Sequence, residues 1–212
     1  MASNSVARAE RAALAELMTE VGPDAPTLCG TWTTRDLAAH LVLRERRPEA
    51  LGLVIPALRG RMESVQDGIA ARPYDEVVAE VRQGPPFWNP MGIGPFDAQA
   101  NTVEFFVHHE DVRRAATGWT PRELDAATTE ALWKVVGTTL RAIAQRSPVG
   151  IDVAPSDGPA AGTTTTLKGG TPSVTLVGPV GEIVLAVYGR VTSLLEVVGD
   201  PAVAEAFASF PR

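Results

Sequence analysis

The sequence predicts an α+β protein in which a helical bundle is followed by a smaller mixed region. Stretches with apolar residues at helical spacing fill the chain up to Pro148, and short β-branched runs split by glycine and proline follow it. Helices come first and strands later, so the two classes do not alternate. We therefore expect a four-helix bundle over residues 1–147 and a small α+β domain over residues 148–212.

The helical prediction is clearest near the start of the chain. In residues 4–21, Leu14, Leu17, Met18 and Val21 recur at i, i+3, i+4 and i+7 and form one apolar face. The next helix is expected to begin at Thr33, which has capping-box spacing to Asp36. Further helices are expected at about 49–70, with a break at Pro56, and at 74–83, 97–116 and 122–146.

The remaining segments are predicted to be loops and strands. Residues 84–96, GPPFWNPMGIGPF, hold four prolines and three glycines and predict an apolar loop that packs over a neighbouring element. The run SVTLVGPVGEIVLAV predicts a hairpin that turns at residues 178–181. Short helices are expected near 191–198 and 201–208.

Composition narrows the class of function. The chain is 45% hydrophobic with a net charge of −6 and has no basic run, so a nucleic-acid partner is not expected. Cys29 is the single cysteine, which excludes an intrachain disulfide and a thiolate cluster. The N-terminal residues lack the apolar core of a signal peptide, and no uncharged apolar window reaches about 18 residues. We expect no membrane span and a cytoplasmic protein.

The stretch NTVEFFVHHEDVRRA, residues 101–115, concentrates the chain's polar chemistry. Residues four apart share a helix face, so Glu104 and His108 point the same way, and Asn101 and Asp111 extend the polar stripe. Burying such groups unpaired costs roughly 2–7 kcal/mol or more. A divalent metal, most plausibly zinc, would satisfy them, but a helical Glu-x-x-x-His pair supplies two ligands and a third is needed.

The residues alone leave several interpretations open. His40, on the apolar face of the second helix, is the remaining histidine that could complete the site, and His109 is the rival to His108 as a ligand. His40 could equally be a hydrogen-bonded core residue. The pair Glu104 and His108 could be an ordinary surface pair worth about 0.2–0.5 kcal/mol.

A family resemblance adds to this reading. The segments DLAAHL and VEFFVHHEDVRRA resemble the mycothiol-dependent maleylpyruvate isomerase family, which belongs to the DinB-like metal-binding four-helix bundles. The tail SVTLVGPVGEIVLAVYGR followed by GDPAVAEAF is similar to that family's C-terminal domain, which has a sterol-carrier-protein-like fold. The HHED run is typical of a shorter branch whose reactions are unassigned.

The resemblance implies a specific site and chemistry. By motif, His40, Glu104 and His108 correspond to the family's zinc ligands, and Arg190 corresponds to an arginine that would bind an acidic substrate. The implied cofactors are Zn2+, or another divalent metal, and mycothiol or a similar thiol as cosubstrate. The implied reaction is a thiol transfer to, or a thiol-assisted isomerisation of, a small electrophile.

Two other functions are compatible with the sequence. The C-terminal domain and the apolar loop could form a binding module for a small apolar or acidic ligand, with a structural metal. Alternatively, the metal could activate water for hydrolysis, with Glu110 or Asp111 as the base.

Overall fold

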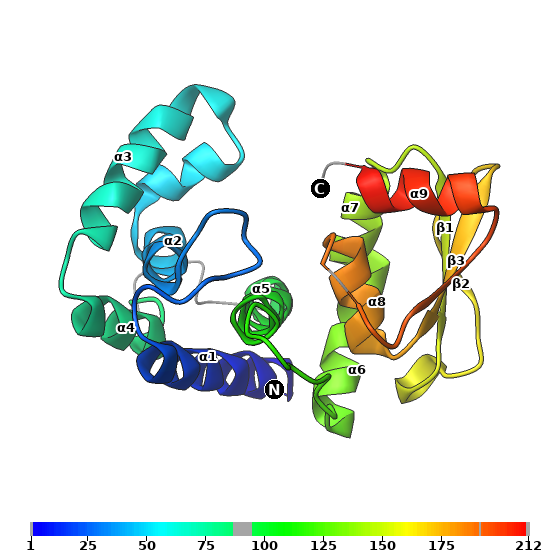
Figure 1. Cartoon of the computed structure of the whole chain (residues 1–212), viewed down its shortest axis with the longest axis horizontal. Coiled ribbons are helices and arrows are strands. Elements are labelled where there is room, and N and C mark those ends of the chain that lie inside the picture. Colours follow the sequence, from blue (N-terminus) through cyan, green and yellow to red (C-terminus); the bar gives the residue numbers. More distant parts are fainter. Residues whose placement is uncertain (1, 87–94, 191, 211–212) are drawn as a thin grey trace. The chain divides into compact units, whose positions relative to one another are not determined.

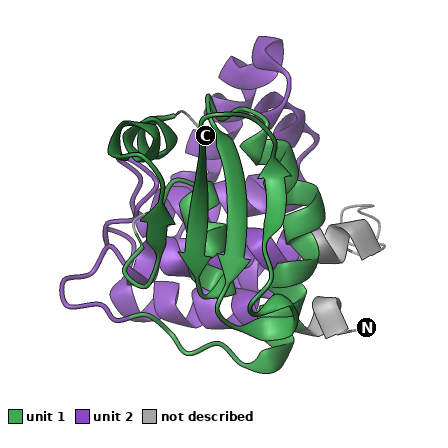
Figure 2. Cartoon of the chain, turned by 90° about the vertical axis from the view of Figure 1, so that its right-hand side faces the viewer, with its two compact units in different colours: residues 1–6, 121–212 green, residues 7–120 purple. Residues whose placement is uncertain are grey.

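A computed structural model describes residues 2–86, 95–190 and 192–210 of the chain. Helices dominate the first part and a four-stranded sheet follows within these residues, which confirms the α+β class (Figure 1). The chain divides into two compact units, shown in different colours in Figure 2. We call residues 7–120 the helical unit, and residues 1–6 with 121–212 the sheet unit.

The helical unit follows the sequence prediction closely. The helix predicted over 74–83 is observed at those bounds. The helix predicted over about 49–70 begins later than expected. Short 3-10 segments take the place of its first turns, because Pro48 and Pro56 interrupt the chain. The predicted loop segment 87–94 lies outside the described residues. The elements are α1 (Ala2–Val21), α2 (Thr34–Arg46), η1 (Pro48–Leu53), η2 (Pro56–Leu58), α3 (Arg59–Ala70), α4 (Tyr74–Gln83) and α5 (Pro95–Arg113).

One apolar core joins these helices. Leu14 from α1, Leu41 from α2, Val77 from α4 and Phe105 from α5 are almost fully buried in it. The helices α1 and α4 each bury one face in this core, whereas α2 and α5 are buried on most sides. This core fixes α2 beside α5, the two helices that carry the predicted metal ligands.

The sheet unit places helices around a mixed sheet of order β2-β1-β3-β4. The strands β1 and β3 pair in parallel, and the two outer pairs are antiparallel. Its elements are α6 (Ala126–Val135), the π-helical turn η4 (Val136–Leu140), α7 (Arg141–Ala144), β1 (Gly150–Pro155), η5 (Gly158–Ala160), β2 (Thr165–Lys168), β3 (Ser173–Gly178), α8 (Val180–Val187), β4 (Glu196–Val198) and α9 (Pro201–Ser209).

The predicted hairpin at residues 178–181 is wrong. The strand β3 ends at Gly178, and the following apolar run forms α8 instead of a second strand. Every residue of α8 is buried, so the run has no polar face that would reveal a helical period. Pro179 precedes the first turn and Glu182 lies within it, both of which favour a helix start.

Two other parts of the sheet unit differ from the prediction. Residues 196–198 form the strand β4 rather than the end of a helix, whereas the helix expected at 201–208 is observed as α9. The expected boundary at 147/148 marks the start of the strands, but the compact units divide at 120/121. The two divisions differ because α6 packs against α8 and η5 of the sheet unit.

Candidate metal centre

The helix α2 carries the first residue of the candidate site. A capping box starts it: the Thr33 backbone N–H donates to Asp36 Oδ2 at 2.8 Å. His40 then lies in the middle of the helix between buried leucines, and its side chain is only 10% exposed. The apolar pattern that buries α2 therefore also buries this imidazole.

The helix α5 carries the other two residues. Glu104 and His108 lie one turn apart and point to the same side, and their side chains are 21% and 12% exposed. Phe105 and Val112 of the same helix enter the apolar core. The helix is thus fixed by its apolar residues while its polar stripe is turned toward α2.

The structure brings His40, Glu104 and His108 together. Glu104 Oε1 lies 3.5 Å from His40 Nε2 and 3.4 Å from His108 Nε2. All three residues can offer ligand atoms within 4.8 Å of one another. Ligand bonds of about 2.0–2.1 Å in a tetrahedral zinc site place neighbouring ligand atoms about 3.3 Å apart. The observed spacing therefore fits a zinc ion.

A buried carboxylate supports His108 from its other side. Asp111 Oδ2 lies 2.9 Å from His108 Nδ1, and the Asp111 side chain is completely buried. A hydrogen on Nδ1, donated to this carboxylate, leaves the lone pair on Nε2 free to bind a metal. This carboxylate–histidine arrangement is the usual outer support of a metal-binding imidazole.

The thiol of Cys29 joins the same support. Its Sγ donates to Asp111 Oδ2 at 3.0 Å and lies 3.7 Å from His108 Nδ1. Cys29, His108 and Asp111 thus form a second trio close enough to hold a metal. The two trios share His108 but use opposite nitrogens of its ring.

His40 differs from His108 in its surroundings. Its Nδ1 is buried and has no hydrogen-bond partner in the described part of the chain. Its ring lies 5.1 Å from the Trp32 ring and 5.6 Å from the His108 ring, measured between centroids. On its Nδ1 side the imidazole therefore lacks the outer carboxylate that supports His108, and ring contacts with Trp32 and His108 help to position it.

Arg44 borders the cluster one turn after His40. Its Nε lies 3.4 Å from Glu104 Oε1, and its guanidinium donates to Asn101 Oδ1 at 2.6 Å. Without a metal, Arg44 and the charged His108 place positive charge beside Glu104. With a metal, the same guanidinium would hold the carboxylate in place.

These contacts shift the acidities of both ionisable ligands on α5. Burial opposes ionisation of Glu104, but His108, His40 and Arg44 outweigh it and hold its pKa well below the usual range. Burial also opposes the charged form of His108, but Asp111, Cys29 and Glu104 raise its pKa well above the usual value. In the metal-free protein the pair is therefore a carboxylate facing an imidazolium.

His109, the rival ligand, lies in a different environment. Its Nδ1 is 2.9 Å from Glu10 Oε2, and both side chains are buried between α1 and α5. It does not belong to either trio that could hold a metal.

The two candidate bases for hydrolysis are both engaged elsewhere. Asp111 is fully buried against His108 and Cys29. Glu110 is 1% exposed and pairs with Arg113 at 2.9 Å and with Arg114 at 2.6 Å. Neither carboxylate is accessible to a substrate, so the geometry gives hydrolysis no support.

Arg190 lies in the sheet unit, three residues after the end of α8 at Val187. Its guanidinium donates to the Tyr188 carbonyl at 2.8 Å, and its backbone N–H donates to Leu185. The segment before it is a helix and not the strand that the sequence predicted.

Sequence reasoning missed three neighbours of the candidate site. Arg44 could have been found, because it lies four residues after His40 and so shares its helix face. Cys29 and Trp32 belong to the loop before α2, and no periodic pattern connects that loop with α5. Their contacts with His108 and His40 depend on tertiary folding alone.

The fold and the cluster define a helical domain with a two-histidine, one-carboxylate centre, joined in sequence to an α+β unit. Residues 6–86 match the family model described as the mycothiol maleylpyruvate isomerase N-terminal domain. This match to the N-terminal part of the chain confirms the resemblance noted in the sequence. The matched range contains His40 but ends before Glu104 and His108.

Two solved structures share the fold. The crystal structure of the mycothiol-dependent maleylpyruvate isomerase has a TM-score of 0.55 and 15% sequence identity, over 93% of this chain and 92% of that chain. A crystal structure of a histidine-to-alanine mutant of the mycothiol-dependent maleylpyruvate isomerase gives 0.55 and 14% over the same shares. No curated protein sequence matches the chain. At this identity the likeness establishes the fold.

Among the described residues, every helix is too short or too polar to cross a bilayer.

Proposed function

We propose that the chain is a metal-dependent enzyme whose cosubstrate is a low-molecular-weight thiol of the mycothiol class. The enzyme would either transfer this thiol to a small electrophile or use the thiol to isomerise the electrophile. The observation that carries the proposal is the convergence of His40 Nε2 and His108 Nε2 on Glu104 Oε1. The family match and the shared fold support it. Zinc is the proposed metal, because nitrogen and oxygen ligands at this spacing suit it.

A zinc ion with three protein ligands keeps an open position and, as a Lewis acid, lowers the pKa of a thiol to favour the thiolate. The protein's own residues prepare this site. Asp111 accepts a hydrogen bond from His108 Nδ1–H and so orients Nε2. Arg44 contacts the Glu104 carboxylate, and the Asn101 amide oxygen in turn accepts a hydrogen bond from Arg44.

The proposed reaction class follows from thiolate chemistry. A thiolate adds to an activated double bond, and its later departure leaves the isomer; alternatively it displaces a leaving group and stays attached. We further propose, by family resemblance, that Arg190 binds an acidic group of the electrophile. Because the reaction needs a reduced thiol, we propose a cytoplasmic location.

Metal analysis and an activity screen test the proposal together. We expect about one zinc per chain after purification with zinc present. We expect turnover of activated alkenes and alkyl halides only when a thiol is added, and loss of this turnover in Glu104→Gln. The variant His109→Gln is the matched control, because it removes a neighbouring imidazole outside the cluster.

Two outcomes would contradict the proposal. A protein that stays metal-free in excess zinc would remove its basis. The second outcome is a protein that binds zinc but catalyses no reaction between any tested thiol and electrophile. If a chelator also lowers its thermal stability strongly, the metal is structural and the protein is a binding module.

A further inference from the structure

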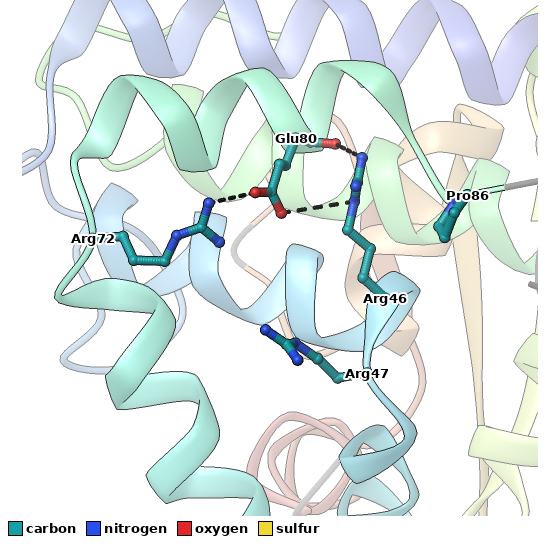
Figure 3. A pocket seen from close by; sticks show the side chains of 5 residues that line it. All are labelled: Arg46, Arg47, Arg72, Glu80 and Pro86. Atoms are coloured by element: carbon teal, nitrogen blue, oxygen red, sulfur yellow. Dashed lines mark hydrogen bonds and ion pairs between the residues drawn. The ribbon is translucent and has the colours of Figure 1, made fainter.

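A second polar site lies in the helical unit, around the end of α2 and the side of α4. It is a cleft of about 420 Å3 lined by Arg46, Arg47, Arg72, Glu80 and Pro86 (Figure 3). This volume falls within the range of small-molecule sites, roughly 300–1,000 Å3. Unlike an ordinary ligand pocket, it is lined mainly by charged groups.

The charges in the cleft do not balance. Three guanidinium groups and one carboxylate line the cleft, and a second carboxylate, Glu76, lies 3.9 Å from Arg72. One positive charge is therefore in excess, in a chain whose net charge is −6. The count holds at neutral pH, because the contact with Arg72 keeps the pKa of Glu80 below its usual value. A local positive excess in an acidic protein favours an anionic ligand.

Two of the arginines are held in place by the protein. Arg72 pairs with Glu80. Arg46 donates to the Gly84 carbonyl at 2.9 Å and to the Glu80 carbonyl at 3.2 Å. Its buried Nε lies 3.8 Å from Glu80 Oε2, which is an ion pair beyond hydrogen-bond distance (Figure 3). Fixed guanidinium groups lose little entropy when they bind an anion.

The third arginine has no such contact. Arg47 is exposed, and within the described residues its side chain makes no hydrogen bond or ion pair. Figure 3 shows it lying below Glu80 in that view, with no dashed line to the other residues. Its full set of donors therefore remains available to a ligand.

We infer that this cleft binds a dianionic phosphate group, either as free phosphate or as the phosphate of a small metabolite. The three guanidinium groups come from α2, the residue after it and the segment before α4, so they approach from different directions. A tetrahedral oxyanion presents oxygens in several directions, whereas one arginine fork already satisfies a planar carboxylate.

This cleft is separate from the candidate metal centre. Arg46 follows His40 by six positions, which places it about 9 Å further along the axis of α2 and on another face. The inference therefore goes beyond the proposed enzyme function and does not depend on it. Phosphate binding that persists in Glu104→Gln would assign the site to the cleft and exclude the metal centre.

Phosphate binding can be measured by 31P NMR titration of the full chain at constant ionic strength, above the second pKa of phosphate. We expect saturable binding in the millimolar range, as is usual for partly exposed charges. Arg47→Gln should weaken it about tenfold, the effect of losing a charge-assisted contact. Acetate in place of phosphate should bind more weakly; equal binding of acetate would overturn the assignment to a phosphate group.

Two further variants add an expected gain in phosphate affinity and a control. Glu80→Gln removes the competing carboxylate and should tighten phosphate binding, provided that circular dichroism shows a retained fold. Arg82→Gln is the matched control, because Arg82 is also exposed and forms no side-chain contact in the described residues, but it does not line the cleft. Absence of saturable binding, or equal losses in Arg47→Gln and Arg82→Gln, would overturn the inference.

Discussion

The two adjacent histidines of α5 lie in two different buried clusters, and the comparison shows what distinguishes a structural pair from a candidate metal centre. His109 faces the Glu10 carboxylate at 2.9 Å. His108 shares Glu104 with His40 and Arg44, at longer distances of 3.4–3.5 Å, and has a second carboxylate behind it.

The difference lies in how many groups converge and how closely. A contact at hydrogen-bond distance satisfies the facing nitrogen of an imidazole without a metal. In the His108 cluster, two imidazole nitrogens approach one oxygen at the edge length of a coordination tetrahedron rather than at hydrogen-bond distance. Both clusters place a largely buried histidine beside a carboxylate, so that pairing alone does not identify a metal site.

The largest difference between the clusters is expected in metal content. Glu104→Gln keeps the side-chain volume but removes the anionic ligand, so metal should fall from about one ion per chain to a trace. His109→Gln should keep the full metal content. Mass spectrometry of the native proteins measures both, and equal metal loss in the two variants would remove the distinction.

The outer carboxylate should have the next largest effect. Asp111→Asn keeps the shape beside His108 but removes the charge that orients its ring, so zinc affinity should fall about 10- to 100-fold. Competition with a chelating dye measures the affinity. An unchanged value would show that Asp111 only packs behind the imidazole.

The Glu10 cluster should matter for stability instead. In the metal-free protein, His109→Gln should lower the free energy of unfolding by about 1–3 kcal/mol, because Glu10 loses a buried partner. Urea denaturation followed by circular dichroism measures this change. A variant as stable as the original would indicate that the His109 contact contributes nothing.

A smaller effect is expected in the protons that His108 releases when the metal binds. The contacts with Asp111, Cys29 and Glu104 raise the pKa of His108, so metal binding near neutral pH must displace about one proton. Zinc affinity should therefore increase with pH until the raised pKa is passed. Calorimetry in two buffers of different ionisation enthalpy counts the protons.

The same shift predicts how metal-free stability depends on pH. The stabilisation from charged His108 should be complete below the usual histidine pKa of about 6.5 and should disappear as pH rises through the raised value. Asp111→Asn should reduce this pH dependence. A metal-free protein whose stability does not decline over that interval would contradict the assigned shift.

The sequence predicted the helical unit better than the sheet unit. The helices α1 and α4 each bury one face, so their apolar residues recur with the helical period. The helices α2 and α5 are buried on most sides, but α2 carries a capping box that marks its start. The helix α8 is also buried throughout, but it has eight residues with Glu182 as its one polar side chain, which is why it was taken for a strand. The exposed strand β4 has three residues, too few for an alternating pattern.

The candidate site was predictable only in part. Helical spacing placed Glu104 and His108 on one face, but the role of His40 came from resemblance, because only the packing of α2 against α5 connects them. Cys29 and Asp111, which contact His108 from behind, lie 82 positions apart on a loop and a helix. No sequence pattern predicts that they meet. Conversely, the environment of His109 could not be told from that of His108, since both lie in the same HHED run.

X-ray absorption spectroscopy of the zinc-loaded protein, without added thiol, tests the central claim most directly. The two trios that could hold a metal differ in one atom type, because one contains the Cys29 sulfur and the other does not. Binding by His40, Glu104 and His108 predicts nitrogen and oxygen neighbours at about 2.0–2.1 Å, with the scattering pattern of two imidazoles. A sulfur neighbour at about 2.3 Å would place the ion at Cys29, His108 and Asp111 and would contradict this assignment.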